Sequence, residues 1–161
     1  MALVEDARSV AESRSQTLRV MFQDEARFGR ITDPSRCWAQ KGVRPVVGKQ
    51  LVREYVYAYG AVSPQDGQSD FLILSRMDQE CFGIFLDEIS QRHHNDYILM
   101  ICDGASCHKA KFLDKPDNIK LVALPPYSPQ LNPQENIWDD MREKWFKNIL
   151  DSAKFRYQDI S

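Results

Sequence analysis

The sequence has 161 residues, of which 43% are hydrophobic and 27% charged, values close to the averages of globular proteins. A chain of this length suits one domain, and this composition excludes disordered and collagen-like proteins. No stretch approaches the roughly 20 apolar residues that span a bilayer, so no membrane partner is expected. Acidic residues stand where a signal peptide has its apolar core, and the four cysteines fit neither a disulfide framework nor paired zinc motifs, which favours the cytoplasm.

The first half of the chain contains strand patterns. Residues 1–16 are polar and mixed, and we interpret them as a frayed helix or the remnant of a linker. Alternating apolar residues predict a strand from Thr17 over TLRVMFQDEA, closed by Asp24. The segment RCWAQKG predicts a short second strand that ends at Gly42. Further strands are predicted over VREYVYAYGAV and DFLILSR, separated by the turn SPQDG.

The second half alternates helical and strand patterns. Asp78 is predicted to cap a helix over QECFGIFLDEISQRHH. The apolar runs YILMICDGA and IKLVALPP are typical of buried strands, with a short helix over HKAKFLDK between them. Asn132, followed by Pro133, predicts the start of a last helix that reaches about Leu150. This order predicts an α/β fold, with a mixed sheet, antiparallel in its first strands and parallel in its later ones, flanked by helices.

Three acids stand at the ends of these predicted elements. Asp24 ends the first strand, Asp103 follows the apolar run YILMIC, and Glu135 lies in the first turn of the last helix. Each has an ordinary alternative, namely an ion pair of Asp24 with Arg27, a turn at Asp103 and a charged helix start at Glu135. A lone buried carboxylate is costly, however, and a hard divalent cation such as magnesium compensates that charge. Together the three acids indicate a metal site.

The last helix can present its acid at the border of an apolar stripe. At 100° per residue, Trp138, Met141, Trp145 and Ile149 form one stripe, and Glu135 lies roughly 80° from its middle. Glu135 can therefore lie at the edge of the core. Asp139, one turn later, shares that side and is the alternative third acid.

Basic residues concentrate in one segment. Between Arg27 and Arg53 there are seven bases and one acid, a net charge of +6, whereas the rest of the chain carries −8 for a total of −2. With an aromatic residue inside it, this segment predicts contacts with nucleic-acid phosphates, although a solvated charged hairpin is the alternative. The candidate DNA-binding residues of the segment are Arg27, Arg30, Arg36, Trp38, Lys41 and Arg44.

Three segments resemble a known family. FQDEARFG, ICDGASCHKA and LPPYSPQLNPQENIWDDMR resemble the catalytic blocks of DDE transposases of the mariner-like superfamily, closest to the bacterial insertion sequence 630 family. The last block is the most specific, and the 32 positions between Asp103 and Glu135 lie in the range of this superfamily. The resemblance covers about residues 17–150 and implies a ribonuclease H-like catalytic domain there, between the N-terminal segment 1–16 and a C-terminal tail over 151–161.

The resemblance also implies a chemistry. Asp24, Asp103 and Glu135 would bind two Mg²⁺ ions, with Mn²⁺ as substitute, for DNA cleavage and strand transfer by in-line attack. His108 occupies a position where relatives often have a histidine; an ordinary residue at a helix start is the alternative, and Lys109 beside it is a further candidate for DNA contact. The implied partners are transposon-end and target DNA and a second copy in a homodimeric complex, in the bacterial cytoplasm at the nucleoid.

Two departures from the family pattern leave alternatives open. The sequence begins about 23 residues before Asp24, so we expect the helix-turn-helix module of complete relatives on a separate polypeptide or lost. Gly104 follows Asp103 where the family often has asparagine, which affects a hydrogen bond around the acid. The alternatives are a catalytically silent or domesticated relic that binds DNA or a partner, and a ribonuclease H-like nuclease without strand transfer.

Overall fold

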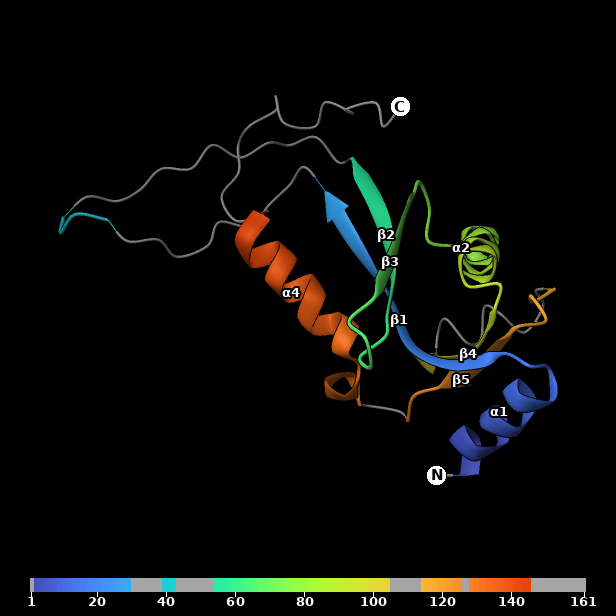
Figure 1. Cartoon of the computed structure of the whole chain (residues 1–161). Helices are drawn as coiled ribbons and strands as arrows, with labels where there is room; N and C mark the ends of the chain where they lie inside the picture. Colours follow the sequence, from blue (N-terminus) through green and yellow to red (C-terminus); the bar gives the residue numbers. More distant parts are fainter. Residues whose placement is uncertain (1, 30–38, 43–53, 105–113, 126–127, 146–161) are drawn as a thin grey trace.

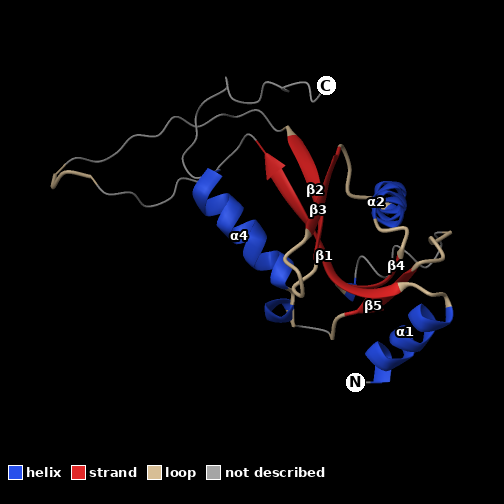
Figure 2. Ribbon diagram, in the orientation of Figure 1, coloured by secondary structure: helices blue, strands red, loops and turns tan. Residues whose placement is uncertain are grey.

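The computed structural model describes residues 2–29, 39–42, 54–104, 114–125 and 128–145. In this part of the chain, helices cover both faces of a five-stranded sheet (Figures 1 and 2). Among the described residues, no helix has the length and apolar character needed to cross a membrane. In chain order the elements are α1 (Ala2–Ser13), β1 (Thr17–Gly29), β2 (Tyr55–Val62), β3 (Ser69–Leu74), α2 (Gln79–Arg92), β4 (Asp96–Cys102), β5 (Ile119–Ala123), the short 3₁₀ turn η2 (Pro129–Leu131) and α4 (Pro133–Trp145).

The sheet has the order β3-β2-β1-β4-β5 and is mixed. Strands β1, β2 and β3 are antiparallel neighbours, whereas β4 runs parallel to both β1 and β5. Strand β1 pairs with β4 from Thr17 to Phe22 and with β2 from Phe22 to Gly29. The central strand therefore changes its partner at Phe22. This topology confirms the predicted ribonuclease H-like architecture.

Successive residues of the strands pack into hydrophobic clusters on opposite faces of the sheet. Met21, Tyr59 and Met100 belong to a core under α2, which contributes Phe82 and Phe85. On the opposite face, two smaller clusters lie under α1 and under α4. The α1 cluster is built around Tyr97 and Leu99 of β4, and the α4 cluster around Ala26, Ala58 and Trp138.

Two predicted strand limits differ from the structure. Strand β1 does not close at Asp24 but continues to Gly29, because Ala26 and Phe28 pair with β2 and pack under α4. The predicted strand ending at Gly42 is absent from residues 39–42, which form coil and a turn. Gly42 has φ +88°, a conformation that favours glycine and ends an extended segment. Residues 36–38 of that predicted strand lie outside the described residues.

The N-terminal segment also differs from the expected frayed helix or linker. Helix α1 buries Ala7 and Ala11 against Tyr97 and Leu99. The guanidinium of Arg14 lies over the ring of Tyr97, 5.5 Å from its centroid. Two alanines four positions apart form a narrow stripe that brings the helix close to the sheet, and their small size hides this packing among the polar residues around them.

Several local predictions are confirmed. Asp78 caps α2 by accepting the N–H of Cys81 at 2.9 Å, and Asn132 caps α4 by accepting the N–H of Gln134 at 3.1 Å.

Cys81 is free and buried, whereas Cys102 is disulfide-bonded, which the cysteine spacing did not predict. The predicted extension of α4 to Leu150, the tail over 151–161 and most of the helix over HKAKFLDK lie outside the described residues; residues 114 and 115 of that helix are not helical.

Candidate active site

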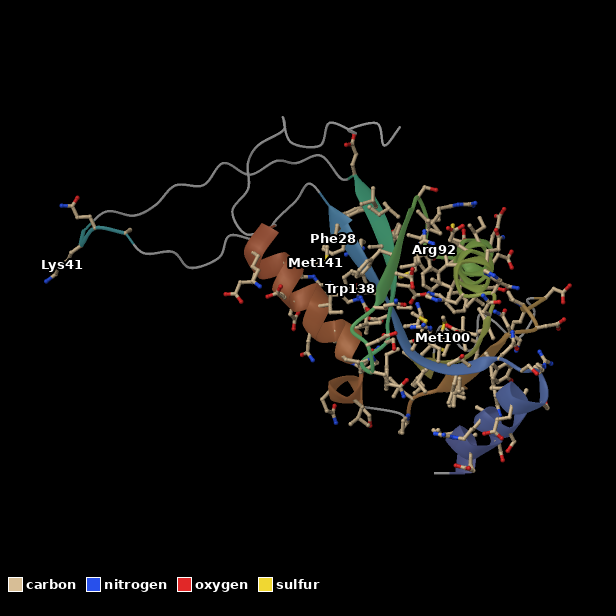
Figure 3. All side chains as sticks on the ribbon, in the orientation of Figure 1. Phe28, Lys41, Arg92, Met100, Trp138 and Met141 are labelled. Carbon is tan, nitrogen blue, oxygen red and sulfur yellow. The ribbon has the colours of Figure 1, made fainter. Side chains whose placement is uncertain are left out.

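Strand β1 presents Asp24 on the face that carries α4. Ala26 and Phe28, two and four positions later, pack against Trp138, and the rings of Phe28 and Trp138 lie 5.9 Å apart (Figure 3). Glu25 points to the other face, where its charge helps to raise the pKa of Tyr59 in the core under α2. Since successive strand residues face opposite ways, only Asp24 of these two acids lies on the α4 side.

Strand β4 ends next to Asp103. Leu99 of β4 lies in the cluster under α1, and the strand ends at Cys102, directly before Asp103. The parallel ladder of β1 and β4 ends at the pair Phe22–Ile101, two residues before Asp24 on one strand and two residues before Asp103 on the other. Asp103 is close enough to Asp24 for its charge to help raise the pKa of Asp24.

The third acid, Glu135, lies in the first turn of helix α4, which packs on one face of the sheet. Glu135 is the third residue of this helix and is half-buried. The helix start lies directly on β2, because a Cβ added to Gly60 would be 2.5 Å from Nε2 of Gln134 and 2.8 Å from the ring of Trp138. Gly60 is itself the partner of Asp24 in the antiparallel ladder. The close approach at Gly60 therefore places the start of α4 next to Asp24.

The electrostatics of this group of acids are unfavourable for a bare carboxylate. Burial, followed by the charges of Glu135, Glu25 and Asp103, raises the pKa of Asp24 to about 7, although a backbone N–H opposes the shift. The charged neighbours that act most strongly on Asp24 are thus acids themselves. A cation between these side chains would remove the repulsion, and carboxylate oxygens are the ligands that hard divalent ions prefer.

The chemistry of the donors therefore fits a divalent metal. In the described part of the chain, no three His, Cys, Asp or Glu side chains are gathered closely enough to enclose an ion between them. The arrangement supplies carboxylate oxygens from the interior of β1, from the residue after β4 and from the start of α4. The assignment of Asp24, Asp103 and Glu135 as ligands remains a prediction.

The alternative acid and the basic candidates lie elsewhere. Asp139 is exposed and accepts from Arg142 at 3.4 Å, so it has an ordinary surface partner. The guanidinium of Arg27 lies 4.7 Å from the centroid of the Tyr55 ring, and Lys41 is exposed in a turn well away from α4 (Figure 3). The other predicted DNA-binding residues lie outside the described residues: Arg30, Arg36, Trp38, Arg44, His108 and Lys109.

Three residues around the acids were missed by sequence reasoning as parts of the site. Gln134 is fully buried, Gly60 receives the helix start, and Asn132 bonds to β1 as well as capping α4. An isolated glycine inside a strand rich in valine and tyrosine is a signal of close approach, so Gly60 was detectable. The role of Asn132 beyond the cap depends on a strand more than a hundred positions away.

Comparison with known proteins supplies the family. A family model of the DDE superfamily endonuclease matches residues 19–156. The uncharacterized protein y4pE/y4sA of Sinorhizobium fredii (strain NBRC 101917 / NGR234) is 40% identical over 97 residues, which make up 60% of this chain and 72% of that protein.

Solved structures supply the fold. The Mos1 mariner paired-end complex with Mn aligns with a TM-score of 0.60 at 15% identity, covering 92% of this chain and 49% of that one. The paired-end complex with Mg gives 0.59 at 14%, and the Mos1 strand transfer complex 0.55 at 14%; both cover 92% of this chain, and 49% and 48% of theirs. The chain thus spans about half the length of the Mos1 chains it matches. With the family match over most of its length, the chain belongs to the DDE superfamily endonucleases.

Proposed function

We propose that this chain is the metal-dependent catalytic domain of a DNA transposase, which cleaves DNA strands and transfers them to a target. The observation that carries the proposal is the half-buried Asp24, whose pKa is raised to about 7 beside Glu135 and Asp103. A half-buried acid that is held near other acids at a cost in stability is used for chemistry more often than for structure. The family match and the fold shared with Mos1 support the same reading.

In this proposal the three acids hold two divalent ions, Mg²⁺ or Mn²⁺. When bound, such ions activate the attacking water or 3′-hydroxyl and neutralise charge on the leaving oxygen. Asp24 supplies oxygens from the rigid centre of the sheet, Asp103 from the loop after β4, and Glu135 from a helix start. Mos1 paired-end complexes have been solved with Mn and with Mg, which supports this choice of metals.

The proposed partners follow from the same comparison. The Mos1 structures are paired-end and strand-transfer complexes, and one contains the left transposon end. We extend this to transposon-end and target DNA for our chain, contacted through the basic segment between Arg27 and Arg53. The same proposal includes a catalytic domain over residues 17–150, a homodimeric complex and a separate helix-turn-helix polypeptide. It also includes membership of the insertion sequence 630 group and a bacterial cytoplasmic location.

A cleavage and joining assay tests the function. The purified chain is incubated with Mn²⁺ or Mg²⁺, supercoiled plasmid and a labelled duplex that has a free 3′-hydroxyl. We expect metal-dependent nicking and joining that Asp24→Asn, Asp103→Asn and Glu135→Gln each abolish, whereas Asp139→Asn retains both. Nicking without joining would support a simple nuclease, and DNA binding without any cleavage would support a catalytically silent relic.

A further inference from the structure

The side chain of Asn132 connects the two elements that carry Asp24 and Glu135. It is only 3% exposed. Its Nδ2 donates to the carbonyl of Gln23 at 3.1 Å, and its Oδ1 accepts the N–H of Gln134 at 3.1 Å. Gln23 immediately precedes Asp24, and Gln134 immediately precedes Glu135. We propose, on the basis of the proposed function, that Asn132 is a positioning residue that sets Glu135 against Asp24 for metal binding.

The strand side of this bridge occurs where β1 needs a partner. The ladder between β1 and β4 ends at the pair Phe22–Ile101. The carbonyl of Gln23 is the next one along β1, in a residue that is fully buried. A buried carbonyl without a partner is costly. The amide of Asn132 satisfies it and so ties the start of α4 to the backbone beside Asp24.

The helix side of the bridge is equally specific. Pro133 has no N–H, so the N–H of Gln134 is the first donor of α4, and Asn132 accepts it. The N–H of Glu135 bonds back to the carbonyl of Asn132 at 3.2 Å. Gly60 leaves space for Gln134 and Trp138 on the other side. Because hydrogen bonds weaken when their length changes by a few tenths of an ångström, these contacts fix the position of the Glu135 backbone relative to Asp24.

A helix cap alone would not require asparagine. Aspartate and serine cap helices about as well, since capping uses only the acceptor oxygen. Asn132→Asp keeps that acceptor but replaces the donor with an oxygen facing the carbonyl of Gln23. Asn132→Ser keeps the cap with no added charge and is too short to reach β1. Both variants therefore separate the cap from the bridge.

Asn118 provides a matched control at the opposite end of the sheet. Its Nδ2 donates to the carbonyls of Ser90, His93 and Asp96 at 3.4, 3.3 and 3.2 Å. Its Oδ1 accepts from the hydroxyl of Ser90 at 2.6 Å. Asn118→Asp and Asn118→Ser thus remove a comparable amide bridge between other elements, which do not include the three acids.

The experiment measures binding of Mn²⁺ alone to the full chain by the loss of its free electron paramagnetic resonance signal. We expect both Asn132 variants to bind Mn²⁺ roughly 10- to 100-fold more weakly, the range known for residues that orient metal ligands. The added charge of Asn132→Asp would by itself tighten binding, so weaker binding has the opposite sign to a simple charge effect. The Asn118 variants should lose thermal stability and keep the affinity of the wild type.

Folded Asn132 variants with unchanged Mn²⁺ affinity would overturn the proposal and reduce Asn132 to a cap. If Asn132→Asp does not fold, Asn132→Ser decides by the same measurement. If the wild type itself binds no Mn²⁺, the proposed function fails, and a crystal structure of Asn132→Ser then decides the positional claim. A displacement of Glu135 from Asp24 in that structure would support it, and an unmoved Glu135 would refute it.

Discussion

The two ends of strand β4 carry aspartates in opposite electrostatic surroundings. At its start, Asp96 accepts from Nε of Arg19 at 2.6 Å, and the same guanidinium binds Asp66 at 2.6 Å. Beyond its other end, Asp103 lies near Asp24, whose leading charged neighbours are acids. Asp96 and Asp66 at one end of the sheet thus share the guanidinium of Arg19, whereas the charges that raise the pKa of Asp24 at the other end come from acids.

The pKa values express this difference. The hydroxyl of Ser63, the N–H of Gln68 and the guanidinium of Arg19 lower the pKa of Asp66 to about 2. Burial and the charge of Glu135 raise the pKa of Asp24 to about 7. Paired acids at one end stabilise the fold, whereas the group at the other end costs stability. Such a cost is typical of functional sites and agrees with the proposed role of these acids.

The largest expected effect compares the two ends of β4 directly. Asp103→Asn removes a proposed metal-ligand charge, so we expect DNA cleavage to slow by about 1,000-fold or more with little change in thermal stability. Asp96→Asn leaves the partly buried Arg19 with a weaker partner and should cost about 1–3 kcal/mol of stability. Its cleavage rate per folded molecule should match the wild type. Equal losses of cleavage in both variants would contradict the proposal that one end of β4 contributes to catalysis and the other to stability.

The pH dependence of stability should have opposite signs at the two ends. The raised pKa lets folded Asp24 keep its proton up to about pH 7, whereas the unfolded group releases it near the ordinary aspartate pKa of 3.8. Without metal, the wild type should therefore lose up to about 4 kcal/mol from this group as pH rises from 4 through 7. Asp24→Asn should remove that loss and be the more stable protein at pH 8. Urea unfolding at pH 5 and 8 measures it.

Asp66 is the counterpart for that comparison. Its lowered pKa contributes stability that is present above the unfolded pKa near 3.8 and is lost as pH falls toward 2. Asp66→Asn should therefore reduce stability at neutral pH, with a difference from the wild type that shrinks in acid. A stabilising effect of this substitution at pH 8 would show that the paired end is not the stabilising one.

A smaller effect should come from the contact of α4 with Gly60 in β2. Gly60→Ala puts a methyl group 2.5 Å from Nε2 of Gln134 and 2.8 Å from Trp138, so these side chains or the helix start that carries them must shift. We expect a loss of about 1–3 kcal/mol in unfolding free energy and weaker Mn²⁺ binding. Gly104→Ala is the control, because its Cβ would have no atom of the described residues within 4 Å. Thermal unfolding and Mn²⁺ titration of both variants test whether the site depends on this contact.

The smallest effect concerns charge away from both ends. Lys41 lies in the exposed turn far from α4 (Figure 3), within the basic segment proposed to meet DNA. Lys41→Glu should weaken binding to all DNA sequences alike and lower the salt dependence of binding by about one or two ions. Cleavage at saturating DNA should be unchanged. Unaltered affinity and salt dependence would make this lysine a solubility feature.

Local patterns in the sequence determined most of the elements. Alternating and continuous apolar runs predicted strands β1 to β5, and the caps at Asp78 and Asn132 placed the starts of α2 and α4 correctly. The acids Asp24, Asp103 and Glu135 were also candidates from the sequence, because their positions beside apolar runs and their resemblance to family blocks need no three-dimensional information. Periodicity and capping depend on residues within one or two turns, which is why they are readable along the chain.

Tertiary structure alone decided how the acids are held and charged. Strand β1 extends beyond Asp24 because β2 and α4 cover its second half, and α1 is packed because Tyr97 and Leu99 receive its alanines. The bond of Asn132 to β1 joins residues 109 positions apart. The raised pKa of Asp24 likewise arises from burial and from acids distant in sequence. Desolvation and Coulomb repulsion depend on distances in the folded chain, and no local pattern contains them.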